Sequence, residues 1–425
     1  MFGEDIDLII VGAGASGLIA AGQSALKGMR TLVIEKNNRP GVKLSITGKG
    51  KCNITNTGDM EDFIKNFAPN GRYLKPVFYQ FFNHDLIALL QQVGIQIKEE
   101  RGGRVFPANE DSREIVFKLK KWAELAGAKF LSNTRVEKLI IENKLISGIE
   151  ISDSRIINTQ SLIIATGGCS YPVTGSTGDG YILAKQAGHT IIQPLPALVP
   201  LIMAGEFPSS LSGLVLQHVN INVFINGKKA HTLFGEMKFT KNRIDGPIIL
   251  SLSRLIAHNF YASDNIVLKI DLKPTLDDQQ LDLRLLKEIK TSPQIIIGKM
   301  LGNLIPVKLI PFCCQLTGLS LYKSCSSITN TERNKLRVWL KNFQLELQAL
   351  GSFDEAIITQ GGVHLKEINF HTMQSKFIEN LFFAGEVIDI DANTGGYNLQ
   401  AAFSTGWVAG NSAANLCILR SKGLP

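Results

Sequence analysis

Cysteine is scarce in this chain. Six cysteines occur in 425 residues, at positions 52, 169, 313, 314, 325 and 417, and none belongs to a Cys-x-x-Cys pair. A disulfide framework needs a denser pattern, and a redox dithiol or a zinc knuckle needs the paired spacing. The isolated histidines His189, His231, His364 and His371 lack metal-ligand spacing, so we interpret them as surface or core residues and expect no metal. This pattern indicates a protein of the reducing cytoplasm.

A membrane span is also not indicated. Residues 8–26 carry no formal charge, but this stretch of nineteen residues contains four glycines, two serines and a glutamine. Glu4, Asp5 and Asp7 precede it without any Lys or Arg, whereas a signal peptide begins with a basic region. We therefore expect a strand and a turn here, with no membrane anchor or targeting segment.

The charge of the chain favours anionic partners without selecting nucleic acid. Lys and Arg number 45 against 37 Asp and Glu, which gives a net charge of +8. Short basic clusters occur at 118–121 and at Lys228-Lys229, but no basic run is interleaved with aromatic residues as in RNA-recognition motifs. We expect no nucleic-acid partner, and action on RNA is kept as an alternative that salt-dependent retention on RNA would reveal.

Length and composition indicate a globular protein of more than one domain. At roughly 100 to 200 residues per domain, the chain is long enough for two or three. Apolar residues make up 44% and charged residues 19%, so a sizeable core can form. The 39 glycines are partly clustered, as expected where loops approach a ligand.

The N-terminal part has the pattern of a strand, a helix and a second strand. The apolar run 6–11 is typical of a buried parallel strand, residues 16–26 have helical spacing, and residues 31–34 are apolar again. Further strand-like runs follow at 135–141, 145–151 and 161–165. The sequence therefore predicts an α/β fold with a Rossmann-like domain.

The middle of the chain reads as an insertion. Prolines 194, 196 and 200 mark a change of composition, and Asn226-Gly227 joins two alternating runs in a predicted hairpin. Strand patterns return near residue 350 and lead to a helix expected at about 399–419. We expect a discontinuous nucleotide-binding domain at 1–193 and 351–425. The inserted substrate or cap domain, 194–350, would have a β-barrel-like part and a helical part at about 247–310.

Gly12, Gly14 and Gly17 form a G-x-G-x-x-G motif. It follows a predicted strand and opens a predicted helix whose N-terminus can face a diphosphate. We expect Gly14 to supply both space and φ freedom beside that group. Glu35, at the end of the second strand, can accept hydrogen bonds from a ribose, which fits FAD and NAD equally.

Two further glycine clusters favour FAD. Residues 165–168 (Ala-Thr-Gly-Gly) and 383–386 (Phe-Ala-Gly-Glu) each follow a strand, in the three-part layout of FAD proteins of the glutathione-reductase type. In that layout Glu386 would reach the ribityl chain. A second G-x-G-x-x-G in the insertion is lacking, so any NAD(P)H would visit transiently.

The chain resembles the BaiN/YhiN-like bacterial flavoproteins, also called the aminoacetone oxidase family of NAD(P)/FAD-dependent oxidoreductases. The resemblance covers most of the chain and rests on PGVKLSITGKGKCNITN (40–56), GGRVFP (102–107), ATGGCSYPVTGSTGDGYILAKQAGH (165–189), TQGGVHLKEI (359–368) and LFFAGEVIDIDANTGGYNLQAAFSTGWVAG (381–410). It implies an FAD domain split by an insertion with a β-rich part and a small helical part.

The expected FAD-binding residues lie in or beside these segments. They are Gly12, Gly14, Ser16, Gly17, Glu35, Lys36, Lys43, Gly48, Cys52, Asn53, Val136, Thr166, Gly167, Gly385, Glu386, Gly396, Tyr397, Asn398 and Leu399. Cys52 is interpreted as a packed thiol near the flavin ring rather than a nucleophile, and Val136 as backbone beside the adenine. The helix after Gly396 would stabilise negative charge on the reduced flavin near N1 and O2.

The chain departs from the resembled family at Lys241, where members commonly have a histidine after Phe-Thr. The departure alters substrate binding or proton transfer if that histidine serves them, and alters nothing if it only packs. The favoured function is an FAD-dependent oxidoreductase that transfers hydride between flavin N5 and a small organic substrate. Alternatives are a flavoprotein acting on RNA and a non-catalytic FAD-binding redox sensor. The sequence assigns no catalytic acid or base.

Overall fold

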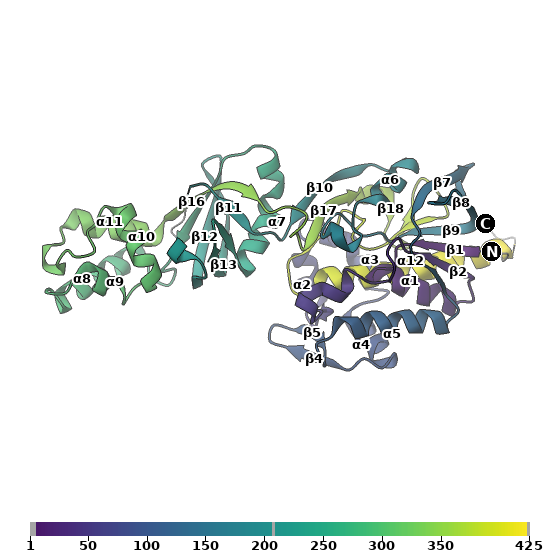
Figure 1. The fold of residues 1–425 in the computed structure, drawn as a ribbon, viewed down its shortest axis with the longest axis horizontal. Coiled ribbons are helices and arrows are strands. Elements are labelled where there is room, and N and C mark those ends of the chain that lie inside the picture. Colours follow the sequence, from purple (N-terminus) through teal and green to yellow (C-terminus); the bar gives the residue numbers. More distant parts are fainter. Residues whose placement is uncertain (1–5, 206–208, 423–425) are drawn as a thin grey trace. The chain divides into compact units, whose positions relative to one another are not determined.

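The computed structural model describes residues 6–205 and 209–422, and the chain divides into two compact units. The first unit comprises the residues through 196 together with those from 353 onward, and the second comprises residues 197–352. The first unit is therefore built from two separate stretches of the chain (Figure 1).

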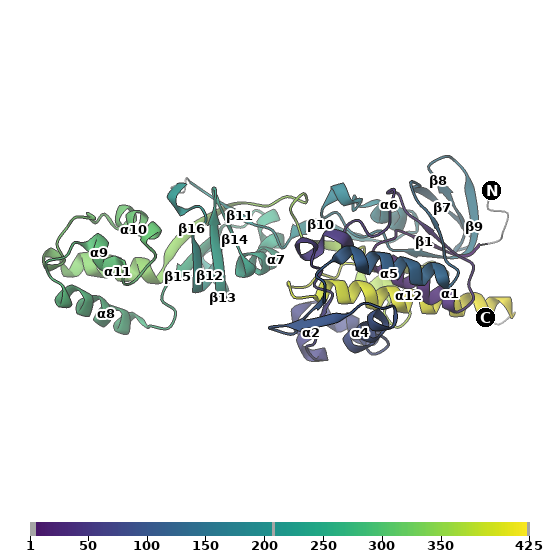
Figure 2. The same ribbon diagram turned by 60° about the horizontal axis from the view of Figure 1, so that its bottom comes forward.

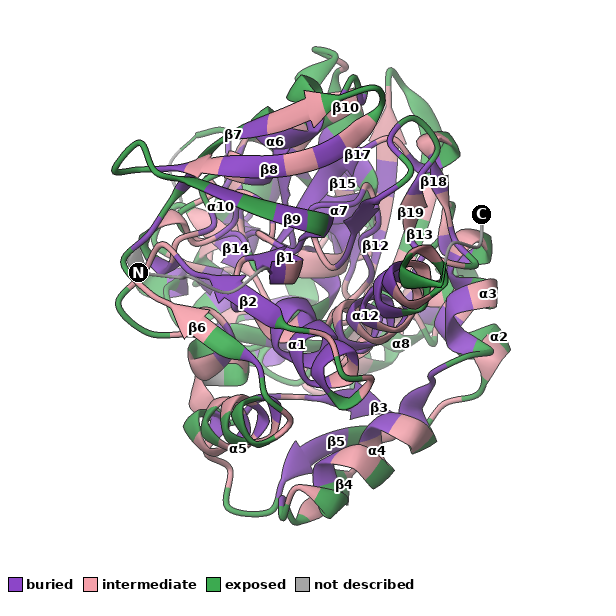
Figure 3. Cartoon of the chain, turned by 90° about the vertical axis from the view of Figure 1, so that its right-hand side faces the viewer, coloured by how far each residue is buried: buried purple, intermediate pink, exposed green. Residues whose placement is uncertain are grey.

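A mostly parallel sheet forms the core of the first unit. Its strands run in the order β18-β19-β20-β9-β1-β2-β6, and β7 and β8 continue from β9. Their bounds are β1 Ile6–Val11, β2 Thr31–Ile34, β6 Lys129–Leu131, β7 Val136–Glu142, β8 Leu145–Ile151, β9 Ile156–Ile164, β18 Ile368–Asn369, β19 Gln374–Ser375 and β20 Leu381–Phe383. Strands β20, β9, β1, β2 and β6 are parallel neighbours, and β1 and β2 are almost wholly buried (Figure 3). The predicted α/β Rossmann-like fold is confirmed.

Helices and two smaller sheets complete this unit. The helices are α1 Ala15–Leu26, α2 Met60–Asn66, α3 Lys75–Phe78, α4 Asn83–Gln92, α5 Ser112–Leu125, α6 Asp179–Gln186 and α12 Tyr397–Ser421. Strands β3 Thr55–Asn56, β5 Arg104–Pro107 and β4 Ile97–Glu100 form one small sheet, and β10 Ile191–Ala197 pairs with β17 Ile358–Val363.

Helix α1 is packed closely on two sides because glycines replace larger side chains. A Cβ atom on Gly406 of α12 would lie 2.3 Å from the carbonyl oxygen of Ser16, and one on Gly410 would lie 2.6 Å from that of Ala20. On another side, the ring of Trp122 from α5 occupies the position that a side chain at residue 22, itself a glycine, would need. These contacts fix the N-terminus of α1 at the sheet edge.

His189 is buried and has a partner on each ring nitrogen. Its Nδ1 lies 3.1 Å from Oε2 of Glu367, and its Nε2 lies 2.8 Å from Oγ of Ser375. The Ser375 oxygen accepts hydrogen bonds from two backbone amides, so its hydroxyl donates to Nε2. Burial lowers the pKa of His189, which favours the neutral ring that this arrangement needs. His189 is thus a core residue, one of the two positions expected for it, and it joins the segment after α6 to the turn before β18 and to β19.

The second unit contains a closed barrel with the strand order β11-β14-β13-β12-β15-β16. The strands are β11 Leu201–Met203, β12 Val215–Ile225, β13 Lys228–Thr240, β14 Arg243–Asp245, β15 Ile266–Asp271 and β16 Phe343–Leu350. Asn226 and Gly227 join β12 to β13 with φ values of 49° and 77°, as the two-residue hairpin turn requires. The predicted β-rich insertion and its hairpin are confirmed.

The helices of this unit are α7 Pro247–Tyr261, α8 Asp278–Thr291, α9 Ile297–Leu301, α10 Ile310–Thr317 and α11 Asn330–Lys341. The expected helical part at about 247–310 differs from this in two respects. Strand β15 interrupts it and belongs to the barrel, because its alternating apolar residues pair with β12 and β16. The helices also continue to Lys341. Among residues 6–205 and 209–422, no helix has the length and apolar character needed to cross a membrane.

Candidate functional site

The three glycines of the N-terminal motif have different structural roles. Gly12 has a φ of 101°, and a Cβ there would lie 2.6 Å from the carbonyl oxygen of Ala165, at the end of β9. A Cβ on Gly17 would lie 1.9 Å from the Gly12 carbonyl oxygen, so both glycines are required by packing. Gly14 has a φ of −76°, which any residue can adopt, and no atom lies within 4 Å of its Cβ position. The expectation that Gly14 needs φ freedom is therefore wrong, and what this glycine keeps open is space at the N-terminus of α1.

Glu35 connects this loop to the end of β2. Its Oε2 accepts a hydrogen bond from the Ala13 amide at 2.9 Å, and its Oε1 accepts one from the Asn37 amide at 2.8 Å. The residue is only 8% exposed. Each carboxylate oxygen keeps lone-pair capacity for a further donor. Glu35 is thus held in a fixed orientation in which it can still accept hydrogen bonds from hydroxyl groups.

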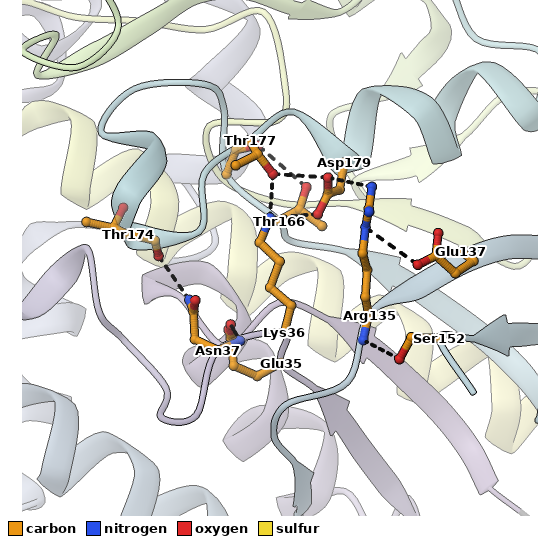
Figure 4. Close-up of polar contacts among 11 residues, drawn as sticks. Glu35, Lys36, Asn37, Arg135, Glu137, Ser152, Thr166, Thr174, Thr177 and Asp179 are labelled. Atoms are coloured by element: carbon orange, nitrogen blue, oxygen red, sulfur yellow. Dashed lines mark hydrogen bonds and ion pairs between the residues drawn. The ribbon is translucent and has the colours of Figure 1, made fainter. Parts of the chain in front are cut away.

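Lys36, the next residue, belongs to an ion-pair cluster (Figure 4). Its Nζ lies 2.7 Å from Oδ2 of Asp179 and also donates to Oγ1 of Thr177. Arg135 approaches the other oxygen of Asp179 at 3.1 Å. Burial opposes ionisation of Asp179, but the hydrogen bond and charge of Lys36 outweigh it, so the pKa of Asp179 lies below its usual value. Lys36 is therefore already paired within the protein.

Glu386 lies at the centre of a second polar cluster. Its Oε2 accepts from Nζ of Lys43 at 2.6 Å, and its Oε1 accepts from Oγ of Ser170 and from the Thr359 amide, each at 2.7 Å. Lys43 also donates to Ser170 at 2.6 Å. Four separate segments of the first unit, around residues 43, 170, 359 and 386, are joined through this carboxylate. The structure thus brings together Lys43 and Glu386, two residues that the sequence predicts to belong to the same FAD site.

The loop before α12 is positioned by a close backbone approach. Gly396 has a φ of 97°, and a Cβ there would lie 2.3 Å from the carbonyl oxygen of Thr55. Asn398 accepts from the Ala392 amide at 2.8 Å and donates to the Ala392 carbonyl oxygen at 2.9 Å, which closes the loop on itself. Tyr397 packs edge-on against Phe63 with ring centroids 4.8 Å apart. Asn398 and Tyr397 therefore shape the loop, and the backbone amides of the first turn of α12, which includes Leu399, remain for a ligand.

The loop containing residues 41–53 supplies a buried thiol and a buried amide. Cys52 is fully buried in an apolar cluster, and burial raises the pKa of its thiol to about 12. At neutral pH it is therefore not a thiolate nucleophile, in agreement with the packed role expected for it. Oδ1 of Asn53 is buried and has no hydrogen-bond partner. Because an unsatisfied buried acceptor is costly, this oxygen marks a position where a ligand donor fits. Gly48, with a φ of 58°, lies in the 3-10 turn that leads to it.

The other expected residues lie at the strand ends. Oγ of Ser16 is 3.3 Å from the Ala384 carbonyl oxygen, and a Cβ on Gly385 would lie 2.5 Å from the same Oγ. Thr166 and Gly167 follow β9, beside the Gly12 turn. Val136 is buried at the start of β7. The carboxyl ends of β1, β9 and β20 therefore converge on one edge of the sheet, the location of ligand sites in open α/β sheets.

Sequence reasoning missed a pair of carboxyl groups beyond Glu386. Burial, and then the charge of Asp391, raise the pKa of Asp389 to about 7, while a hydrogen bond from the Gly361 backbone opposes the shift. Tyr181 is buried nearby, its hydroxyl has no hydrogen-bond partner, and Asp389 is among the charges that raise its pKa. The sequence does contain a signal for this pair, because Asp389 and Asp391 closely follow Gly385-Glu386 and are separated by one residue. Asp389 is a group that can hold a proton near neutral pH.

These features fit a bound dinucleotide such as FAD. Gly14 leaves open space at a helix N-terminus, which suits a diphosphate. Glu35 keeps acceptor capacity for hydroxyl groups, and Oδ1 of Asn53 lacks a donor, which the N–H of a flavin ring could supply. The donor and acceptor set is therefore complementary to that cofactor.

Comparison with known proteins gives a match over almost the whole chain. The family described as HI0933-like protein Rossmann domain matches residues 6–412. A 3-dehydro-bile acid delta(4,6)-reductase of Clostridium scindens is 28% identical over 408 residues, 95% of this chain and 98% of the relative. A ribosomal RNA dihydrouridine synthase of Haemophilus influenzae is 29% identical over 405 residues, covering 94% and 96%. That of Escherichia coli is 26% identical over 408 residues, covering 95% and 97%.

Solved structures share the fold at low sequence identity. The 3-ketosteroid-delta4-(5alpha)-dehydrogenase of Rhodococcus jostii RHA1 superposes with a TM-score of 0.52 at 13% identity and covers 97% of this chain and 98% of its own. A flavocytochrome c3 fumarate reductase gives a TM-score of 0.51 at 17% identity, covering 98% and 79%. Both likenesses concern the fold alone.

The first prediction contrasts two glycines of the same motif. Gly14→Val is expected to yield a folded protein that does not retain FAD, because no protein atom lies within 4 Å of the new Cβ and the side chain fills the space proposed for the diphosphate. Gly17→Val is expected to fail to fold, because its Cβ would collide with the Gly12 carbonyl. Circular dichroism and the flavin absorbance of the purified variants measure both effects. Normal flavin content in Gly14→Val would show that the motif is structural only.

The second prediction concerns the two acidic residues. A hydrogen bond to a charged group is worth about 1.5 to 3 kcal/mol, so Glu386→Ala is expected to weaken FAD binding roughly ten- to a hundred-fold. Glu35→Ala should weaken it similarly, and the double variant should show nearly additive losses because the two residues belong to separate polar clusters. Titration of the apoproteins with FAD measures this. Wild-type affinity in Glu386→Ala would mean that its carboxylate serves only Lys43 and Ser170.

Proposed function

The chain belongs to the HI0933-like Rossmann-domain family and is an FAD-dependent oxidoreductase, and we propose that it reduces a carbon–carbon double bond conjugated with a carbonyl group. The observation that carries this proposal is the chemistry shared by the names of the relatives. A 3-dehydro bile acid with delta(4,6) double bonds is a conjugated ketone, and uridine gives dihydrouridine when the double bond next to its carbonyl is reduced. Reduction of such a conjugated bond adds a hydride to the alkene carbon more remote from the carbonyl and a proton to the other alkene carbon.

The residues proposed to hold FAD all lie in the first unit. When bound, FAD supplies the hydride from N5 of its flavin ring. Gly14 and the N-terminus of α1 would receive the diphosphate, and Glu35 would accept the ribose hydroxyls. Glu386, oriented by Lys43 and Ser170, would accept from the ribityl chain. Asn53 would accept from the ring itself. These roles would hold the reactive ring in one orientation.

The proton is assigned to Asp389. A donor to the carbon beside the carbonyl must be protonated at working pH, and the pKa of Asp389 is raised to about 7. The charge of Asp391 disfavours ionisation of Asp389 and so keeps the proton on it. The group is only partly exposed and follows Glu386 by three residues.

The substrate is proposed to be a small organic molecule. Because the residues proposed to hold FAD all belong to the first unit, the inserted unit is left for substrate selection. NAD(P)H is the proposed electron donor and would bind transiently.

Uridine in RNA is the second candidate substrate. It is favoured by the two relatives named as ribosomal RNA dihydrouridine synthases, which match this chain over 94% and 95% of its length.

The third prediction tests the reaction. Protein reduced anaerobically with NAD(P)H or dithionite is expected to regain oxidised-flavin absorbance when mixed with a 3-oxo-Δ4 steroid acid, with loss of the enone absorbance. A steroid acid with an isolated double bond is the matched control and should leave the flavin reduced. A uridine-containing RNA, assayed for dihydrouridine, tests the second candidate. Equal reoxidation by conjugated and isolated alkenes would contradict the proposal.

The fourth prediction tests the proton donor. If Asp389 must be protonated, the rate of substrate reduction should be constant below its pKa and fall as the pH rises through about 7. Asp389→Asn should lower the rate and remove this fall, because the amide neither titrates nor donates an acidic proton. Flavin reduction by dithionite is the internal control and should not change. An unaltered pH profile in Asp389→Asn would exclude the assignment.

A further inference from the structure

The helical part of the second unit contains a hollow of about 490 Å³. One face of α8 forms its wall through Gln280, Leu283, Arg284 and Lys287, residues three or four positions apart. Lys273 and Thr275, after β15, and Asn303, after α9, complete the polar lining, and leucines supply the apolar part. The helices concerned are labelled in Figure 2. None of the described residues that line the hollow is acidic.

One acidic residue of α8 borders the hollow: Glu288 pairs with Arg284 at 2.6 Å and accepts from Nδ2 of Asn303 at 2.9 Å. The other two face α11. Asp282 accepts from Nε of Arg333 at 2.8 Å, and Asp278 pairs with Arg337, so both carboxylates are turned toward α11. Glu288 balances one of the three cations at the hollow, those of Lys273, Arg284 and Lys287. The remaining two leave the hollow positive.

Two of the three cations at the hollow have no acidic partner. The ammonium groups of Lys273 and Lys287 make no hydrogen bond or ion pair with any residue that the structure describes, whereas Arg284 pairs with Glu288 at 2.6 Å. Burial, and then the charge of Arg284, lower the pKa of Lys273. Two neighbouring positive charges of this kind repel each other until an anion arrives. The net charge to be balanced is about two.

The turn that carries Lys273 is rigid before any ligand binds. Nζ of Lys341 donates to Oδ2 of Asp271 at 2.6 Å, to the Leu276 carbonyl oxygen at 2.7 Å and to the Lys273 carbonyl oxygen at 3.2 Å. The Lys273 amide donates to Oδ1 of Asp271 at 2.8 Å. A preformed turn reduces the ordering entropy that a ligand must overcome.

From this arrangement we propose that the hollow is a binding site for an organic phosphate. A phosphate monoester carries about −1.5 to −2 charges at pH 7, which matches the two unpaired ammonium groups, and Arg and Lys both bind phosphate oxygens. The volume lies within the range of about 300 to 1,000 Å³ for small-molecule pockets, so the leucines can cover the organic part of the ligand. The phosphate belongs either to a free nucleotide or to a nucleic-acid strand, in which two phosphodiesters of one negative charge each supply the same total charge. The site is independent of the reaction proposed above.

The test uses the FAD-loaded full chain and two probes, AMP and a short single-stranded RNA without terminal phosphates. Calorimetry should detect saturable binding of at least one of them. Lys273→Gln and Lys287→Gln are each expected to weaken it by at least about tenfold, the loss of one charge-assisted hydrogen bond. Lys290→Gln removes the same charge from α8 outside the hollow and is the matched control, expected to bind like wild type. Binding of AMP identifies a free nucleotide as the source of the phosphate, and binding of RNA alone identifies a strand.

Three results would overturn the proposal. They are the absence of saturable binding of both probes to the wild type, an equal loss in Lys290→Gln, and binding of adenosine or succinate as tight as that of AMP. Because Lys287 is exposed, Lys287→Gln should fold and still tests the proposal if Lys273→Gln is poorly folded. Thermal melting and flavin absorbance verify the folding of each variant. If the Lys273 and Lys287 variants lose AMP or RNA binding but still reduce the enone, the phosphate site is distinct from the site of the proposed reaction.

Discussion

The close approach of backbones around helix α1 is the constraint on which the candidate site depends. Gly12 and Gly17 permit β1 to turn directly into α1, and Gly406 and Gly410 permit α12 to lie against the outer side of α1 at contact distances that no side chain would allow. With α1 held in this position, its N-terminus faces the edge where β1, β9 and β20 end. The amides and dipole of the helix are then aimed at one fixed point. A side chain at any of these glycines would therefore disturb the packing of α1 itself rather than one contact in the site.

Charges near that edge are mostly balanced within the protein. Lys36 is paired with Asp179, Lys43 with Glu386, and both oxygens of Glu35 accept backbone amides. A diphosphate at the proposed site would therefore meet backbone amides and a helix dipole rather than the ammonium groups of Lys36 and Lys43. The paired lysines act through the carboxylates that they orient. The two lysines thus fix the positions of these carboxylates. A flavin enzyme needs such fixed positions because the reacting atoms of flavin and substrate must be aligned.

The parts of the structure that follow from local rules were predictable from the sequence. The glycine motif, the βαβ unit and the Asn226-Gly227 hairpin each depend on neighbouring residues, whose spacing is visible in the chain. Strand β15 was missed because its stability comes from pairing with β12 and β16, far away in sequence, inside a stretch of helical composition. The same reason hid the partner of Lys36, since Asp179 is 143 positions away. Gly14 does border open space, as expected, but its φ of −76° is one that any residue adopts, and the motif spacing alone does not reveal that angle.

Polar groups that the fold leaves without hydrogen-bond or ion-pair partners indicate where a ligand could bind. An unsatisfied buried acceptor or an unpaired, half-buried cation lowers stability, and the surrounding chain satisfies most such groups, as it does for His189 and Glu386. Oδ1 of Asn53 in the first unit and Nζ of Lys273 in the second lack such partners among the described residues. A ligand that supplies the missing donor or anion would relieve the cost. The two proposed sites therefore call for ligand groups of opposite character, a hydrogen-bond donor at Asn53 and an anion at Lys273.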